Sequence, residues 1–147
     1  MLVVLLLSGW LRSPEACLTA GSRGRTATQV LRRPGQPLLL RVTDLGLADS
    51  AVSRPQASFA GKEFYETIEA KAATLLFGVA RNHPFIDGNK RVAVLAALQF
   101  LNVNGLDLNL SPPEEAYKMI AGVTAGAVTL DVLTAWISAR VEPMPDE

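Results

Sequence analysis

One nine-residue stretch brings together several kinds of side chain that could do chemistry, His83-Pro84-Phe85-Ile86-Asp87-Gly88-Asn89-Lys90-Arg91. It contains the only histidine of the chain, one carboxylate, one amide and two cations. Histidine is the usual general base for a hydroxyl nucleophile. Asp87 is a hard oxygen ligand, and Mg²⁺ favours one or two carboxylates combined with phosphate oxygens and water. The stretch therefore predicts chemistry on a phosphate compound.

The turn Asp87-Gly88-Asn89 is expected to open a helix, which would leave free backbone N–H groups at its positive end. Gly88 would let a phosphate approach the backbone, because a Cβ would obstruct it. Lys90 offers a mobile positive charge, and Arg91 offers a planar fork that suits phosphate oxygens. The turn is thus a predicted anion site.

Each of these residues also has a purely structural interpretation. His83 could simply end a helix, and Asp87 could be an N-cap. Phe85 and Ile86 are expected to anchor the loop in the core. Two cations at a helix start oppose the helix dipole unless an anion lies between them, so the combination favours a functional site.

Hydrophobic spacing predicts an all-α fold around this loop. A short helix begins at Thr43-Asp44 and stops at Arg54-Pro55, and a loop with a buried Phe59 follows. Residues 62–82 form the clearest helix, with an apolar stripe that includes Phe64. Residues 89–102 form a second helix, whose run Val92–Leu101 is apolar on nearly every side and predicts the central, buried helix.

Two more helices are expected after Asn104-Gly105, which supplies a left-handed stop. Ser111-Pro112-Pro113-Glu114 resembles a capping box, and Tyr117, Ile120 and Ala121 would form the apolar face behind it. Thr129 would open the last helix, with a stripe through Val141 and an end at Pro143. These elements define a predicted domain over 43–141 and a tail over 142–147.

The first 42 residues differ from the rest of the chain in composition and in hydrophobic patterning. Met1–Leu7 is apolar but too short to span a membrane. Arginines, prolines and glycines interrupt any period over residues 12–37, so 1–42 is predicted to be a poorly patterned leader. Residues 1–60 carry seven basic and three acidic side chains, and the remainder seven basic and eleven acidic ones. Neither part has the dense basic stripe of a nucleic-acid-binding module.

The nine residues resemble the signature of the Fic/Doc (Fido) superfamily, His-x-Phe-x-Asp/Glu-Gly-Asn-Gly/Lys-Arg, at all seven specified positions. Lys90, and Val94 where Fic enzymes have a second arginine, resemble the Doc (death-on-curing) branch. The likeness runs from about Leu45 to Val141, and it includes Arg54-Pro55-Gln56-Ala57 and Arg81-Asn82.

The resemblance implies a bundle of about six helices and a cytoplasmic toxin of a toxin–antitoxin pair. Doc proteins transfer the γ-phosphate of ATP, with Mg²⁺, to a threonine of translation elongation factor Tu, whereas Fic proteins transfer AMP. The implied partners are thus a cognate antitoxin and that factor, with no direct nucleic-acid or membrane binding.

The resemblance also implies a role for each motif residue. His83 would be the base and Asp87 the metal ligand. Gly88 and Asn89 would form the anion cradle, Lys90 and Arg91 would bind phosphates, and Arg81 would lie beside the site. Lys90 would help to decide which phosphate faces the nucleophile. A catalytically silent module that only binds an antitoxin or a target is the alternative of another class.

Overall fold

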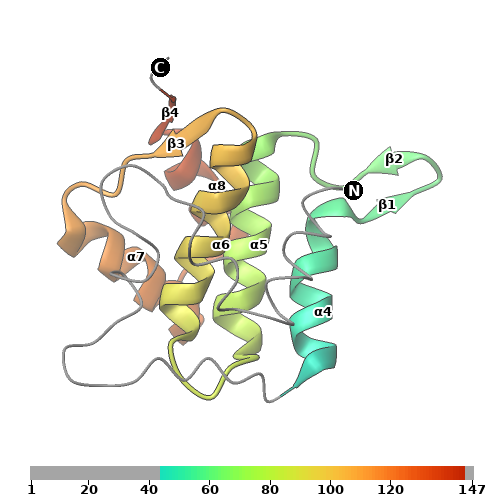
Figure 1. Cartoon of the computed structure of the whole chain (residues 1–147), viewed down its shortest axis with the longest axis horizontal. Helices are drawn as coiled ribbons and strands as arrows, with labels where there is room; N and C mark the ends of the chain where they lie inside the picture. The colour runs from blue at the N-terminus through green and yellow to red at the C-terminus, as the bar shows by residue number, and fades with distance from the viewer. Residues whose placement is uncertain (1–43, 145–147) are drawn as a thin grey trace.

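The computed structural model describes residues 44–144, which form five α-helices, one short 3-10 helix and two small antiparallel strand pairs (Figure 1). The helices are α4 (Leu45–Ser53), α5 (Ile68–Asn82), α6 (Asn89–Val103), α7 (Pro113–Ala125) and α8 (Leu130–Ser138), with η1 (Arg54–Gln56) after α4. The strands are β1 (Ser58–Phe59), β2 (Lys62–Glu63), β3 (Leu106–Leu108) and β4 (Val141–Pro143). The expected all-α class is confirmed. The predicted leader 1–42 lies outside the described residues.

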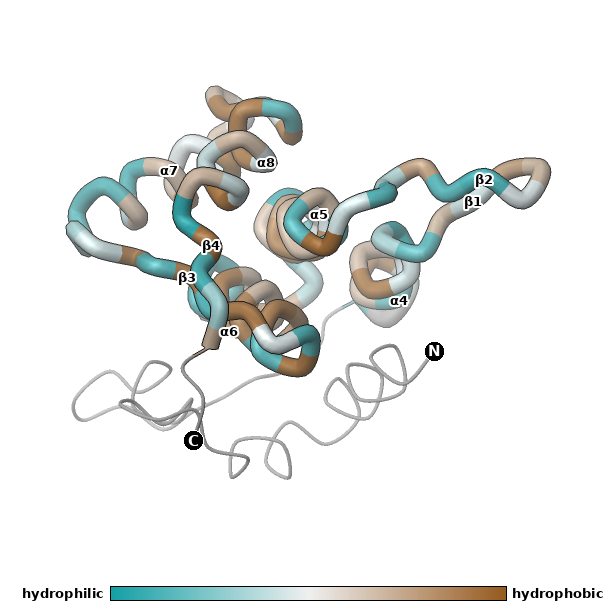
Figure 2. Tube along the Cα trace, turned by 90° about the horizontal axis from the view of Figure 1, so that it is seen from above, coloured by the Kyte–Doolittle hydropathy of each residue, from teal (hydrophilic) through white to brown (hydrophobic). Residues whose placement is uncertain are grey.

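Helix α5 is the hub of the bundle, because it packs against α4, α6, α7 and α8 (Figure 2). Its small and branched residues from Ala72 to Leu76 are all buried, and so are Gly78, Val79 and Ala80. Helix α6 lies along α5 and was expected to be the buried centre. Six of its apolar residues are buried, but Val94, Leu95 and Leu98 are only partly covered. The helix before the motif is therefore the more central of the two.

Side-chain caps fix where several helices begin. The Asp44 carboxylate accepts a hydrogen bond of 3.0 Å from the N–H of Leu47, which confirms the predicted start of α4. Thr129 caps α8 in the same way, as expected, by accepting from Val132. Thr67 accepts from Ala70 at 3.1 Å and so starts α5 at Ile68.

The predicted helix start at residue 62 is wrong. Lys62 and Glu63 instead form β2, which pairs with β1 across a turn at Ala60 and Gly61, both of which have positive φ. Phe59 and Phe64 were expected on buried faces, but they are 75% and 64% exposed. The hairpin projects from the end of the bundle opposite the loop that joins α5 to α6 (Figure 1).

Two expectations for the C-terminal helices also fail. The N-cap of α7 is Pro112 rather than Ser111, so the serine lies one residue too early for a capping box, and its N–H donates to the Asn109 side chain instead. Helix α8 stops at Ser138, and Val141–Pro143 pairs with β3, since the chain reverses after Arg140. Strand β4 includes Glu142 and Pro143, which the sequence assigned to the tail.

The side chains of Glu115, Trp136 and Arg140 tie α7 to α8. Glu115 forms an ion pair with Arg140 and accepts a hydrogen bond of 3.2 Å from the Trp136 indole N–H. The Arg140 guanidinium also lies 4.7 Å from the centre of the Trp136 ring and donates to the carbonyl of Ser111. These contacts lower the pKa of the Glu115 carboxyl, chiefly through its hydrogen bond with Arg140.

In the part of the chain that the structure describes, no helix has the length and apolar character needed to cross a bilayer.

The lowered pKa of Glu115 predicts a pH-dependent contribution to stability. The charged form is favoured in the folded state, so the contribution is present at pH 7 and is lost as the pH falls below the ordinary value of 4.5. In urea unfolding, Glu115→Gln should lower the free energy of unfolding at pH 7, and the difference from wild type should shrink below about pH 4.5. Glu114→Gln, its exposed neighbour, is the control. A difference that stays constant through the acid range would contradict the assignment.

Candidate functional site

The motif forms the loop between α5 and α6, at the lower end of the bundle in Figure 1. His83 is the C-cap of α5, and Asn89 is the first residue of α6. The two helices pack along each other, so the loop is held at both ends by the core. The sequence correctly places both boundaries of this loop. It therefore sits on rigid elements, as a binding site requires.

The backbone of His83 is left-handed, with φ 47° and ψ 53°, and its side chain is exposed. This conformation is uncommon for residues other than glycine, although histidine tolerates it better than most. Such residues cluster at functional sites. Within residues 44–144 the imidazole makes no hydrogen bond to another side chain or to the backbone. The ring is therefore open to a substrate.

The next residues anchor the loop, but only in part as expected. Pro84 and Phe85 are buried, and the Phe85 side chain is 4% exposed within the core. Ile86, which was expected to be a second core anchor, is 62% exposed. The chain turns outward directly after Phe85, so Ile86 and Asp87 face solvent. Asp87 is thus presented on the outside of a fixed loop.

The Asn89 side chain closes the loop with a pair of hydrogen bonds. Its Oδ1 accepts from the N–H of Phe85 at 2.9 Å, and its Nδ2 donates to the carbonyl of Phe85 at 2.8 Å. Asn89 is only 8% exposed, so both bonds lie in a poorly solvated environment. Asn89 was expected to form part of the anion cradle. Its side chain instead fixes the shape of the loop, so its backbone N–H is the group that could bind a ligand.

Helix α6 begins without a side-chain cap. Its N-cap is Gly88, whose φ of 81° lies in the left-handed region, and glycine has no side chain with which to cap the first turn. Asp87 is therefore not the N-cap. The first regular bond runs from the Val92 N–H to the Gly88 carbonyl at 2.9 Å. The N–H groups of Asn89 and Lys90 come before this bond at the positive end of the helix, where backbone N–H groups attract anions.

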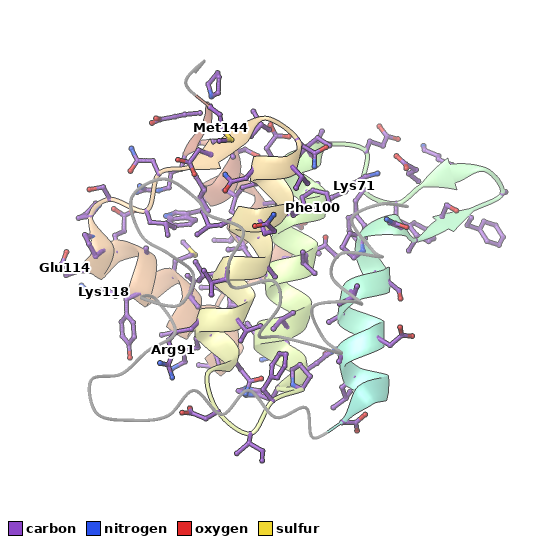
Figure 3. All side chains as sticks on the ribbon, in the orientation of Figure 1. Lys71, Arg91, Phe100, Glu114, Lys118 and Met144 are labelled. Atoms are coloured by element: carbon purple, nitrogen blue, oxygen red, sulfur yellow. The ribbon has the colours of Figure 1, made fainter. Side chains whose placement is uncertain are left out.

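The two cations of the first turn are held differently. Nη2 of Arg91 lies 3.6 Å from Oδ2 of Asp87, four residues earlier, in an ion pair between a half-buried arginine and an exposed carboxylate. Figure 3 shows Arg91 at the lower end of α6, on the side that faces α7. Nζ of Lys90 lies 5.7 Å from the centre of the Tyr117 ring, which belongs to α7. The helix start thus carries two side-chain cations and one facing carboxylate.

Arg81, the weakest candidate from the sequence, lies beside the end of α7. A Cβ built on Gly126 would be 2.6 Å from Nη1 of Arg81 and 3.5 Å from its Cζ. Gly126 is the C-cap of α7 and has a φ of 80°. The carbonyls at a helix C-terminus attract cations, and the Arg81 guanidinium lies next to this end of α7. Glycine at 126 provides the space for it.

The donor set suits a metal that is shared with a ligand better than one held by protein alone. Among the described residues, no group of three or more histidine, cysteine, aspartate or glutamate side chains comes together. Asp87 offers one carboxylate, 63% exposed, beside the uncapped helix start. Magnesium bound through one carboxylate and phosphate oxygens fits this arrangement.

Sequence reasoning missed Tyr117 and Gly126 as neighbours of the motif. Tyr117 was expected on the apolar face of its helix, but it is 66% exposed and turns toward Lys90. Both residues lie on or next to α7, which the packing of the bundle brings to the motif from a distant part of the sequence. No local pattern identifies such a neighbour.

The paired bonds of Asn89 predict a large effect of its removal. Asn89→Ala would leave the buried N–H and carbonyl of Phe85 without partners, at a cost of about 1–3 kcal/mol in the free energy of unfolding. Asn104→Ala is the control, since Asn104 is exposed and its amide makes one hydrogen bond, to the Phe100 carbonyl. Chemical denaturation measures the free energy of unfolding of both variants. Equal losses for the two variants would contradict the role assigned to Asn89.

The close approach of Arg81 to Gly126 predicts that the Arg81 guanidinium is displaced in Gly126→Ala. Gly105→Ala is the matched control, because Gly105 has a φ of 77° but nothing lies within 4 Å of its built Cβ. Left-handed strain should cost both variants ~1–2 kcal/mol. Only Gly126→Ala should shift the NMR signal of the Arg81 guanidinium. An unchanged Arg81 signal in that variant would show that the contact is not formed.

Comparison with known proteins places this geometry in a family. The model of the Fic/DOC family matches residues 18–101, which include the whole motif, α5 and all but the last two residues of α6. The match begins inside the segment predicted to be a leader. It covers more than half of the chain.

Two curated proteins are similar to the chain. Toxin Doc of Mycolicibacterium smegmatis is 52% identical over 69 residues, which are 47% of this chain and 53% of that protein. Protein kinase doc of Escherichia phage P1 is 37% identical over 91 residues, which are 62% of this chain and 67% of that protein. The chain therefore spans about half the length of the first relative and about two thirds of the second. On the family match and these identities, the chain belongs to the Fic/DOC family.

Proposed function

We propose that this protein is a Doc-type toxin that transfers the γ-phosphate of ATP to a hydroxyl group of a target protein. The observation that carries the proposal is the motif loop. An exposed histidine, an exposed carboxylate and an uncapped helix start with two cations lie on one nine-residue segment that the core fixes at both ends. Phosphoryl transfer asks little more of a protein than positioning, charge neutralisation and an oriented nucleophile.

The start of α6 is the proposed phosphate site. The N–H groups of its first turn and the helix dipole favour a polyanion, and Gly88 has no Cβ to obstruct the approach to the backbone. Lys90 and Arg91 add two full charges, which offset the cost of bringing negative phosphates close together. Asp87 would hold the magnesium ion beside the phosphates, where the metal neutralises charge that develops during transfer.

His83 is the proposed general base. Its imidazole takes the proton of the attacking hydroxyl as the new oxygen–phosphorus bond forms and the bond to the leaving ADP breaks. The left-handed backbone of His83 ends α5 and starts the motif loop, so the base and the phosphate site belong to the same rigid segment. Arg81, held near the end of α7, is a further proposed neighbour of the site.

The biological role is proposed from the relatives. One similar protein is named as a toxin and another as a protein kinase. A toxin of this type would act in the cytoplasm, pair with a cognate antitoxin and, by family resemblance, modify a threonine of translation elongation factor Tu.

Transfer of AMP, as in Fic enzymes, is the second candidate reaction. Those enzymes have glycine at the position of Lys90, and the lysine favours transfer of the γ-phosphate.

The test is intact-mass analysis of elongation factor Tu after incubation with the protein, ATP and Mg²⁺. The expected result is the added mass of one phosphate, and a rate lower by roughly 10²–10⁴-fold with His83→Ala. Added AMP would replace the kinase with the second candidate. An unmodified factor in the presence of a folded protein that binds ATP would contradict both reactions. Growth inhibition by His83→Ala equal to wild type would favour the silent binding module.

A further inference from the structure

We infer that Tyr117 is a positioning residue for Lys90, and through it for the phosphates that the helix start would bind. The inference rests on the proposed function, because it assigns a specific task to one of the cations of that site. Its starting point is the contact already described, 5.7 Å between Nζ of Lys90 and the centre of the Tyr117 ring. Cation–π attraction acts at distances up to about 6 Å.

The position of the Tyr117 ring is not explained by burial. The side chain is 66% exposed, while the apolar face of α7 is formed by Ala116, Ile120 and Val123, all buried. A large aromatic ring left in solvent gains little from the hydrophobic effect. Here its face instead meets a cation from the first turn of a neighbouring helix. The contact with Lys90 is thus the specific interaction that the structure gives this ring.

The ring holds Lys90 without neutralising it. Within residues 44–144 no carboxylate lies within ion-pair distance of Lys90, in contrast to Arg91, which faces Asp87. A carboxylate partner would cancel the positive charge, and an anion would have to compete with it. An aromatic face attracts the ammonium but carries no net charge, so Lys90 stays fully attractive to phosphate.

The contact with Tyr117 would increase the affinity for phosphate by preorganising the Lys90 side chain. A lysine side chain loses much rotational freedom when it binds an anion, and fixing it beforehand reduces that loss. An exposed cation–π contact is of a strength that corresponds to about a two- to fivefold change in affinity. Removing the ring should therefore weaken phosphate binding by about that factor.

The experiment measures the affinity of the full chain for ATP·Mg²⁺ and for inorganic tripolyphosphate by calorimetry. Tyr117→Leu removes the aromatic face and keeps an apolar side chain, so both ligands should bind about two- to fivefold more weakly. Tyr117→Phe keeps the ring and should bind both ligands as tightly as the wild type does. Phe59→Leu is the matched control, since Phe59 is an exposed aromatic residue on the hairpin at the other end of the bundle.

A double-mutant cycle with Lys90→Gln shows whether Tyr117 acts through Lys90. In that background Tyr117→Leu should have no further effect. A loss that persists there would overturn the inference, and so would unchanged affinities in Tyr117→Leu. Weaker binding of ATP with unchanged binding of tripolyphosphate would assign the ring to the nucleoside and would also overturn it. Wild-type protein that binds neither ligand would contradict the proposed function itself, and the inference with it.

Discussion

Two hydrogen bonds between the Asn89 amide and the backbone of Phe85 hold the site together. They join the first half of the motif loop to the first residue of α6, with distances of 2.9 and 2.8 Å in a poorly solvated environment. Phe85 is itself packed in the core that surrounds α5. The shape of the loop is therefore coupled to the packing of the bundle, and the chemistry-bearing side chains around it can stay exposed without becoming loose.

The charges on this loop follow a simple division. Asp87 and Arg91 face each other across one helical turn, whereas Lys90 rests against the uncharged face of Tyr117. Two side-chain cations near the positive end of α6 oppose its dipole, and a bound polyanion would relieve that opposition. The proposed phosphate ligand would thus stabilise this arrangement of charges. This charge pattern is the support that the structure gives to the proposed phosphate ligand.

The local parts of the fold could be predicted from the sequence, and the tertiary parts could not. The caps at Asp44 and Thr129 depend on residues three positions away, so their patterns are visible in the chain. The hairpin around Gly61 has strands of two residues, too short to show alternation, and Phe64 coincidentally continues the stripe of α5. In the site, the motif correctly predicted where the loop begins and ends. It could not show that the Asn89 amide binds backbone or that Tyr117 reaches Lys90, because those contacts depend on how the chain packs.

The most direct test of this account is a titration of the ¹⁵N-labelled protein with ATP·Mg²⁺, followed by amide chemical shifts. If the uncapped start of α6 is a preformed phosphate site, the amides of Gly88, Asn89 and Lys90 should show the largest saturable changes. The amides of Phe59 on β1 and of Phe64 directly after β2, at the other end of the bundle, should stay unchanged. Saturable changes that avoid the loop and the first turn of α6, or the absence of any saturable change, would contradict the account.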